Sequence, residues 1–422
     1  MKDRTHGYTP STGVGAQMGP VRKRITELDA LRGFAILGIA LANFPEFSLW
    51  TFLDSGTQAA LPRSGADPVV RFLQYLLVDG KFYTIFSILF GIGFSITIAN
   101  ARKRGADGMK IFYRRMGGLT LIGLIHLLFV WNGDILLLYA LLGMLLPLFY
   151  RCKPGTLLKW SAAFLLLPIV ISALRVLTGV DPSVPLYDAW WKEAGAVGIN
   201  EGNFATWLRD ASTYSQMFRF LRQGAIERMW EFVSGMRYFK VLGLFLFGFW
   251  IGRNKVHERL GEFRLAFRKV GAVCLAVGLP LSVAYAWIGT HGGNPVLKET
   301  VYAFSVYPLA VSYMCGLLLL IAGKGRETLA GRLSVSLAAP GKMALTSYLS
   351  QSVIGIILFY GIGFGLGASM TLWETELVAL AVFVLEVILS GLWLRRFAFG
   401  PVEWVWRMWT YGKYFPLRKG RE

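Results

Sequence analysis

The chain has 422 residues, of which 55% are hydrophobic and 14% aromatic, whereas only 16% are charged. A soluble protein of this length could not bury so much apolar surface, so the composition argues against a soluble protein and indicates a polytopic membrane protein. The formal net charge is +19, but the Lys and Arg residues are divided among many short connections. This distribution predicts basic cytoplasmic loops and no nucleic-acid partner.

The first 24 residues predict a disordered cytoplasmic tail, because residues 1–20 are polar and rich in Gly, Ser, Thr and Pro. The apolar run that follows is long enough to span a membrane, and no small-residue cleavage site comes after it. We therefore interpret this run as a first transmembrane helix and not as a removable signal peptide.

Ten apolar runs approach the length of a spanning helix. They lie at about 31–50, 82–99, 116–131, 134–150, 157–178, 236–252, 268–289, 301–322, 343–363 and 372–394. Every second connection between them is basic, and the others, such as WNGD at 131–134, contain few Lys or Arg residues. By the positive-inside rule, both termini are cytoplasmic and the number of helices is even. The predicted fold class is all-α: a polytopic transmembrane helix bundle of about ten helices within residues 25–398.

Two segments are predicted not to span the membrane. Residues at about 180–235 form an outer amphipathic insertion, which includes the stretch YSQMFRFLRQGAIERMWEFV. Residues 399–422 mix tryptophans with basic residues and predict an interfacial cytoplasmic C-terminal helix. Within the spanning runs, Gly248 with Gly252, and Gly91 with Ser95, have the small-residue spacing that lets helices approach closely.

Polar side chains in the first run are candidate functional residues, because such groups are costly inside a membrane. Asp29 and Arg32 are three residues apart and share a helix face as an ion pair, although they could equally anchor the inner end of the helix. Asn43 follows Arg32 by eleven residues, so the two project from nearly the same face about 16 Å apart. This is the geometry of a helix that lines a polar cavity; an amide that only bonds a neighbouring helix is the alternative.

A second group of candidates lies near the outer ends of the next helices. His126 and Asp134 flank the tight WNGD turn between two antiparallel helices, so the carboxylate could orient the imidazole as a general base. A helix cap formed by Asp134 is the structural alternative. Lys81 adds a cation on the same side, unless its long side chain only extends to the interface. The three cysteines and four histidines show no metal-ligand spacing, so we expect no metal.

Five blocks carry a resemblance over nearly the whole chain: LDALRGFAILGIALAN, KFYTIFSILFGIGF, HLLFVWNGDILLLYALLG, GKMALTSYLSQSVIGIILFY and GPVEWVWR. In this order they resemble the bacterial YeiB-like family of inner-membrane proteins, which is similar to the transmembrane acyltransferase superfamily. Acyltransferase-3 members of that superfamily have an Arg-x10-His pattern on the first helix. Here Arg32 matches the first position, but Asn43 occupies the second. The heparan-α-glucosaminide N-acetyltransferase branch is similar to this chain in having Asn there, but its catalytic His follows in an outer loop, and residues 44–70 here contain no His.

The resemblance implies an acyltransferase in the bacterial plasma membrane that moves an acyl group from cytosolic acyl-CoA to an acceptor on the outer side. If this chemistry is retained, we infer from this sequence, and not from residues of the family, that His126 and Asp134 are catalytic and that the substrate-binding residues are Asn43, Lys81, Arg32 and Asp29. The alternative is a transporter or flippase of a lipid-linked or small amphipathic metabolite, and a non-catalytic scaffold is a third possibility. Expected partners are membrane lipids and a small-molecule or lipid-linked acceptor, and homo-oligomerisation stays open.

Overall fold

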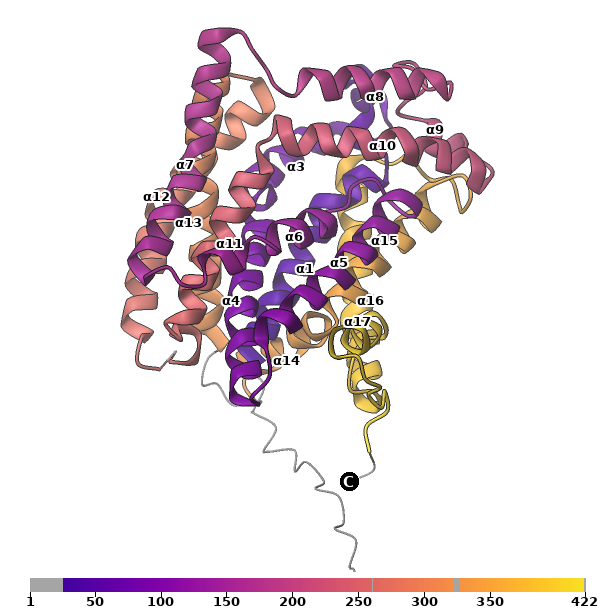
Figure 1. Ribbon diagram of the computed structural model, residues 1–422. Coiled ribbons are helices and arrows are strands. Elements are labelled where there is room, and N and C mark those ends of the chain that lie inside the picture. The colour runs from indigo at the N-terminus through magenta and orange to yellow at the C-terminus, as the bar shows by residue number, and fades with distance from the viewer. Residues whose placement is uncertain (1–25, 260, 322–326, 421–422) are drawn as a thin grey trace, which may run out of the picture.

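The computed structural model describes residues 26–259, 261–321 and 327–420, and the predicted disordered tail lies outside them. The helices are α1 (Thr26–Phe47), α2 (Ser55–Ala60), α3 (Asp67–Leu73), α4 (Lys81–Lys103), α5 (Gly108–Phe129), α6 (Leu136–Gly143), α7 (Pro154–Thr178), α8 (Val184–Ala196), α9 (Trp207–Asp210), α10 (Tyr214–Ser234), α11 (Arg237–Arg253), α12 (Arg264–His291), α13 (Pro295–Ile321), α14 (Leu329–Lys342), α15 (Ala344–Phe359), α16 (Leu372–Arg396) and α17 (Pro401–Tyr411). Short 3-10 or π turns are η1 (Trp50–Phe52), η2 (Ser64–Ala66), η3 (Gln74–Val78), η4 (Leu146–Phe149) and η5 (Val256–Glu258). The described residues form an all-α bundle without a β-strand (Figure 1).

Each of the ten predicted apolar runs corresponds to a helix, but not every run is a complete span. Within the described residues, seven helical segments are long and apolar enough to cross a membrane, and nine are if each of two bent pairs counts as one span. The pairs are α10 with α11, bent by 66°, and α14 with α15, bent by 76°. The predicted run at 134–150 is divided into α6 and η4 and is shorter than a span. The protein is therefore a multi-pass membrane protein whose shorter apolar helices depend on their neighbours.

The small residues noted in the sequence meet at the crossing of α4 and α11. A Cβ atom added to Gly91 would lie 2.0 Å from the carbonyl oxygen of Phe245, and one added to Gly248 would lie 2.0 Å from that of Ile88. A Cβ on Gly252 would lie 2.7 Å from the Cβ of Ser95. The close approach predicted from these spacings is thus confirmed, since only glycine lets the two backbones come this near.

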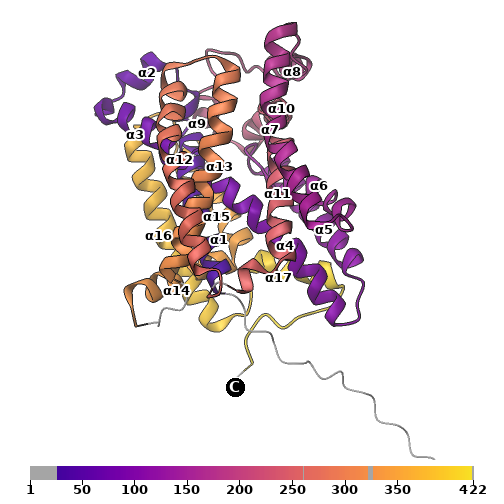
Figure 2. The same cartoon turned by 90° about the vertical axis from the view of Figure 1, so that its left-hand side faces the viewer.

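The two ends of the bundle carry different short helices. In Figure 1, α8, α9 and α10 lie together at one end, and α14 and α17 lie at the other; Figure 2 shows the same division from the side. By the charge pattern, the end with α14 and α17 is the predicted cytoplasmic side. The predicted C-terminal helix is shorter than expected. It ends at Tyr411, and the following segment returns so that the amide of Ala398 donates to the carbonyl of Leu417.

Candidate functional site

Helix α1 contains Pro45 near its C-terminal end, and this residue has no amide hydrogen to donate to the carbonyl of Leu41. The side-chain Nε2 of Gln74, from η3, lies 3.4 Å from that carbonyl oxygen and replaces the missing donor. The same Nε2 donates to the carboxylate of Glu376 on α16. A backbone carbonyl left without its helical donor is tolerated in a membrane only when such a partner satisfies it, so Gln74 compensates for Pro45.

A cavity of about 700 Å³ runs along α1 through the bundle. Its lining includes nine basic and four acidic residues, which is far more charge than a packed membrane interior carries. The middle is apolar and aromatic, with the side chains of Ile36, Ile39, Phe86, Leu89, Phe90 and Leu119. Arg32, Asn43 and Glu46 on α1 all line it. The predicted cavity along one face of the first helix is therefore present.

The end of the cavity at α14 and α17 is strongly basic. Arg32 on α1, Arg115 on α5, Lys342 on α14 and Arg407 on α17 all line it. The Nη1 of Arg32 lies 2.7 Å from Oδ1 of the buried Asp29, so the predicted ion pair forms. The guanidinium of Arg115 stacks 4.0 Å from the centre of the Trp406 ring. Four separate helices thus bring cations to one place, and we call these four residues the basic cluster.

Glu403 on α17 also lines this end of the cavity and caps the N-terminus of α15. One carboxylate oxygen accepts from the amides of Leu345 and Thr346, at 2.7 and 3.1 Å, and the other accepts from the Thr346 hydroxyl at 2.5 Å. Burial raises the pKa of Glu403, although these hydrogen bonds oppose the shift. Glu403 therefore occupies the helix N-terminus itself, and an anion at this end would have to bind the basic cluster instead.

The opposite end of the cavity carries groups of both signs. Glu46 lies one turn beyond Asn43 on the same face of α1. Its carboxylate is within electrostatic range of Asp79, Arg228 and Arg237, but within the described part of the chain it makes no hydrogen bond or ion pair. A carboxylate placed in this way is chemically available to a ligand in the cavity.

His126 and Asp134 meet as predicted, and a serine joins them. The Nδ1 of His126 lies 2.8 Å from Oδ2 of Asp134, and its Nε2 lies 3.0 Å from the hydroxyl of Ser352 on α15. The other carboxylate oxygen of Asp134 accepts from the amide of Leu137, so the predicted alternative role as a helix cap is also present. All three side chains are buried and none lines the cavity. They lie directly behind its wall, because Tyr348 lines the cavity and its ring centre is 5.3 Å from that of His126.

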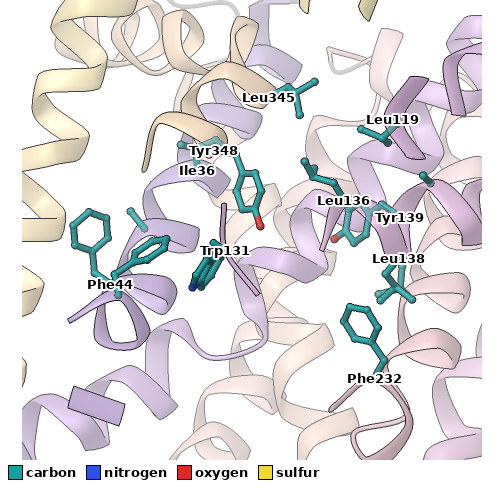
Figure 3. Close-up of a cluster of buried hydrophobic side chains, with 14 of the residues drawn as sticks. Ile36, Phe44, Leu119, Trp131, Leu136, Leu138, Tyr139, Phe232, Leu345 and Tyr348 are labelled. Atoms are coloured by element: carbon teal, nitrogen blue, oxygen red, sulfur yellow. The ribbon is translucent and has the colours of Figure 1, made fainter. Parts of the chain in front are cut away.

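Aromatic rings pack around this triad, with Tyr348 on the side of the cavity. Figure 3 shows the rings of Trp131 and Tyr348 near each other, with Ile36 and Leu136 in the same cluster. The ring of Trp131 also lies 4.3 Å from that of Phe47.

The turn that presents Asp134 is held by α10. The Nε of Arg228 donates to the carbonyl of Asp134 at 2.8 Å, and its two terminal nitrogens donate to the carbonyl of Gly133 and to Glu231. The amide of Asn132 donates to Glu227 at 3.2 Å. The amphipathic helix predicted as an outer insertion thus positions the WNGD turn.

Lys81 is separate from the other candidates. It is fully buried, its ammonium donates to the carbonyl of Tyr75, and it lies 5.0 Å from the centre of the Tyr285 ring. Lys81 does not line the cavity, whereas its neighbours Gly80 and Phe82 do. Its ammonium faces protein groups and not the interface.

Comparisons with known proteins agree over nearly the whole chain. The chain is 31% identical over 401 residues to an uncharacterized 39.9 kDa protein in the amylase 3′ region of Bacillus acidopullulyticus, covering 95% of this chain and 97% of that protein. It is 28% identical to the uncharacterized protein YxaH of Bacillus subtilis, covering 94% and 96%, and 29% identical to the uncharacterized protein YeiB of Escherichia coli, covering 92% and 96%. Residues 251–413 match a family described as a protein of unknown function, DUF418. The chain belongs to the YeiB-like family.

Three functional-site residues of this YeiB-like protein were not predicted from its sequence. Glu46 could have been found, because it stands three residues after Asn43 and so shares its face. Ser352 has a weaker signal, the polar run TSYLSQS within an apolar helix. Arg228 has none, since its partners on the WNGD turn are about 94 residues away in the chain.

Proposed function

We propose that this protein is a membrane-embedded acyltransferase that moves an acyl group from cytosolic acyl-CoA to an acceptor on the outer side of the plasma membrane. The observation that carries the proposal is the cavity along α1, whose lining joins a basic end to a polar opposite end through an apolar middle. Arg and Lys side chains bind phosphate groups, and an apolar channel suits a flexible acyl-thioester arm. The basic end of the cavity thus fits the phosphate groups of acyl-CoA, and the apolar middle fits its acyl-thioester arm.

The reaction needs a base and a hydrogen-bond donor to the oxyanion at the outer end. The acceptor oxygen or nitrogen forms a bond to the acyl carbon, the carbon–sulfur bond breaks, and the proton of the acceptor passes through a base to the departing thiolate. The amide of Asn43, which lines the cavity, would donate a hydrogen bond to the oxyanion. Lys81, which the sequence analysis assigned to substrate binding, is directed to Tyr75 and Tyr285 and supports the oxyanion role less well.

Two side chains compete for the role of base. His126 has the orientation that a base requires, because Asp134 holds its Nδ1, but Tyr348 lies between its ring and the cavity. Glu46 lines the cavity directly, one turn from Asn43. Matched variants separate the two. Loss of activity in Glu46→Gln but not in Asp134→Asn would assign the base to Glu46, and the reverse would assign it to His126.

The test is release of CoA from acyl-CoA by the purified protein in lipid nanodiscs, with the free thiol as readout. Arg115→Gln, in the basic cluster, should raise KM for acyl-CoA by about tenfold, which corresponds to about 1.4 kcal/mol of lost binding. Lys110→Gln is the matched control, because Lys110 is an exposed cation on the same helix that does not line the cavity. If the wild-type protein neither binds acyl-CoA nor releases CoA, the proposal is wrong.

A second function, transport or flipping of an amphipathic metabolite, is favoured by the two broken helices. The bend between α10 and α11 brings Gly235 and Arg237 to the cavity wall, and the bend between α14 and α15 brings Gly341 and Ala344 there. Discontinuous helices that end at a central site are typical of transporters. Substrate movement across proteoliposomes without any CoA release would favour this function over acyl transfer.

A further inference from the structure

A second polar site lies on the far side of α15, away from the cavity lining. Glu386 is 6% exposed on α16, fourteen residues after Leu372 and ten before Arg396. At 1.5 Å per residue, it is about 21 Å and about 15 Å from the two ends of that helix. It therefore lies deep within a membrane span, where an ionised carboxylate is costly.

The contacts of Glu386 are all with uncharged groups of α15. Its Oε1 lies 2.9 Å from the hydroxyl oxygen of Ser350, and its Oε2 accepts from Nε2 of Gln351 at 2.8 Å. The Ser350 hydroxyl also lies 2.8 Å from the carbonyl oxygen of Ser347, one turn earlier. Within the described residues, Oε1 of the buried Gln351 has no hydrogen-bond partner. This site thus contains more acceptors than donors.

The number of available hydrogens decides which protonation state of Glu386 fits these contacts. A serine hydroxyl has one hydrogen and can donate it only once. If Ser350 donates to Ser347, the short contact between Ser350 and Glu386 needs a hydrogen from the carboxyl group. A neutral Glu386 supplies it, and each of the three contacts then has one hydrogen. From this geometry we infer that Glu386, Ser350 and Gln351 form a proton-binding site within the membrane, with Glu386 as the protonated group.

The charged groups nearby do not replace the proton. The charged residues of α16 itself are near its ends: Glu374, Glu376, Arg395 and Arg396. Helix α15, which bonds Glu386, has no charged residue. Helix α1 also packs on α16, and its charged residues are near its ends: Glu27, Asp29, Arg32 and Glu46. The charged residues of the other two helices are Arg332 and Lys342 on α14, and Asp67 and Arg71 on α3. None of these forms an ion pair with Glu386 in the part of the chain that the structure describes. A cation is therefore not available to stabilise an ionised carboxylate.

The site connects to the cavity through α15. Ser350 and Gln351 bind Glu386 on one side of this helix, Ser352 bonds His126 on another, and Tyr348 lines the cavity. Removing the proton would force the Ser350 hydroxyl to leave Ser347 and donate to the carboxylate. Proton binding at Glu386 thus acts on the same short helix that carries the cavity wall. This inference does not depend on acyl transfer.

Infrared difference spectroscopy of the full-length protein in lipid nanodiscs tests the site. The glutamate side chains are labelled with carbon-13, which shifts their carbonyl bands. A neutral-carboxyl band is thereby assigned to Glu and not to Asp. At neutral pH, we expect wild type to show such a band, Glu386→Gln to lose it, and Ser350→Ala to shift it, because its hydrogen-bond acceptor is gone. Glu262→Gln is the control, because Glu262 is an exposed carboxylate paired with Arg259, and it should leave the band unchanged.

Two results would overturn the inference. One is a neutral-carboxyl region that is the same in Glu386→Gln and wild type, which would mean that Glu386 is ionised. The other is a band that Ser350→Ala leaves at its original frequency, which would mean that the carboxyl does not donate to Ser350. The serine variant keeps the acid, so it decides the question even if Glu386→Gln does not fold.

Discussion

A bulky side chain at Gly93 should block the cavity without disturbing the packing of the bundle. Gly93 lies near the middle of α4 and lines the cavity, and a Cβ added there would have no heavy atom within 4 Å. Gly93→Ala should stabilise the protein by up to about 1 kcal/mol, because alanine is the better helix former. Gly93→Phe should place its ring among Leu89 and Phe90 in the apolar middle, where the proposed acyl arm would pass.

We expect Gly93→Phe to lower acyl-CoA-dependent CoA release by at least about tenfold, or about 1.4 kcal/mol in the barrier. Its thermal unfolding midpoint should stay close to that of wild type. Gly117→Phe is the matched control, since Gly117 on α5 has equally open space but does not line the cavity. A folded Gly93→Phe protein with the wild-type rate would refute the idea that the middle of the cavity is the path.

The other predictions concern stability, measured as thermal unfolding in nanodiscs. Gly248→Ala should destabilise the protein by about 1–3 kcal/mol, since its Cβ would meet the carbonyl of Ile88; the same change at Gly93 has the opposite sign, and equal effects would contradict the packing described for α4 and α11. Arg228→Met should cost about 3 kcal/mol, because two buried carbonyls and Glu231 lose their donor. Arg222→Met, on the same helix but exposed, should cost less than about 1 kcal/mol. A similar loss in both variants would show that the hydrogen bonds of Arg228 to the WNGD turn are unimportant for stability.

The sequence predicted where helices form better than how they cross the membrane. Apolar runs identify the helices, because an unsatisfied backbone is excluded from lipid. Whether a run of 16 or 17 residues spans alone depends on its neighbour, and α11 and α15 are continued by α10 and α14 through bends. Hydropathy does not encode such bends, so a simple count of ten spans overlooked them.

The candidate site was predictable where its partners are close in the sequence. The His126–Asp134 contact follows from a short turn between antiparallel helices, and the Asp29–Arg32 pair follows from helical spacing. The hydrogen bond between His126 and Ser352, and those of Arg228 to the WNGD turn, join residues that are far apart in the chain. The position of Tyr348 between His126 and the cavity likewise depends on tertiary packing, which one sequence does not specify.

The most direct test of the central claim is a density map of the protein in nanodiscs with saturating acyl-CoA. We predict phosphate density within hydrogen-bond distance of Arg115 and Arg407, and density for an acyl chain that runs along α4 toward Asn43. A cavity that holds only membrane lipid under these conditions, with no acyl-CoA bound at the basic cluster, would contradict this prediction.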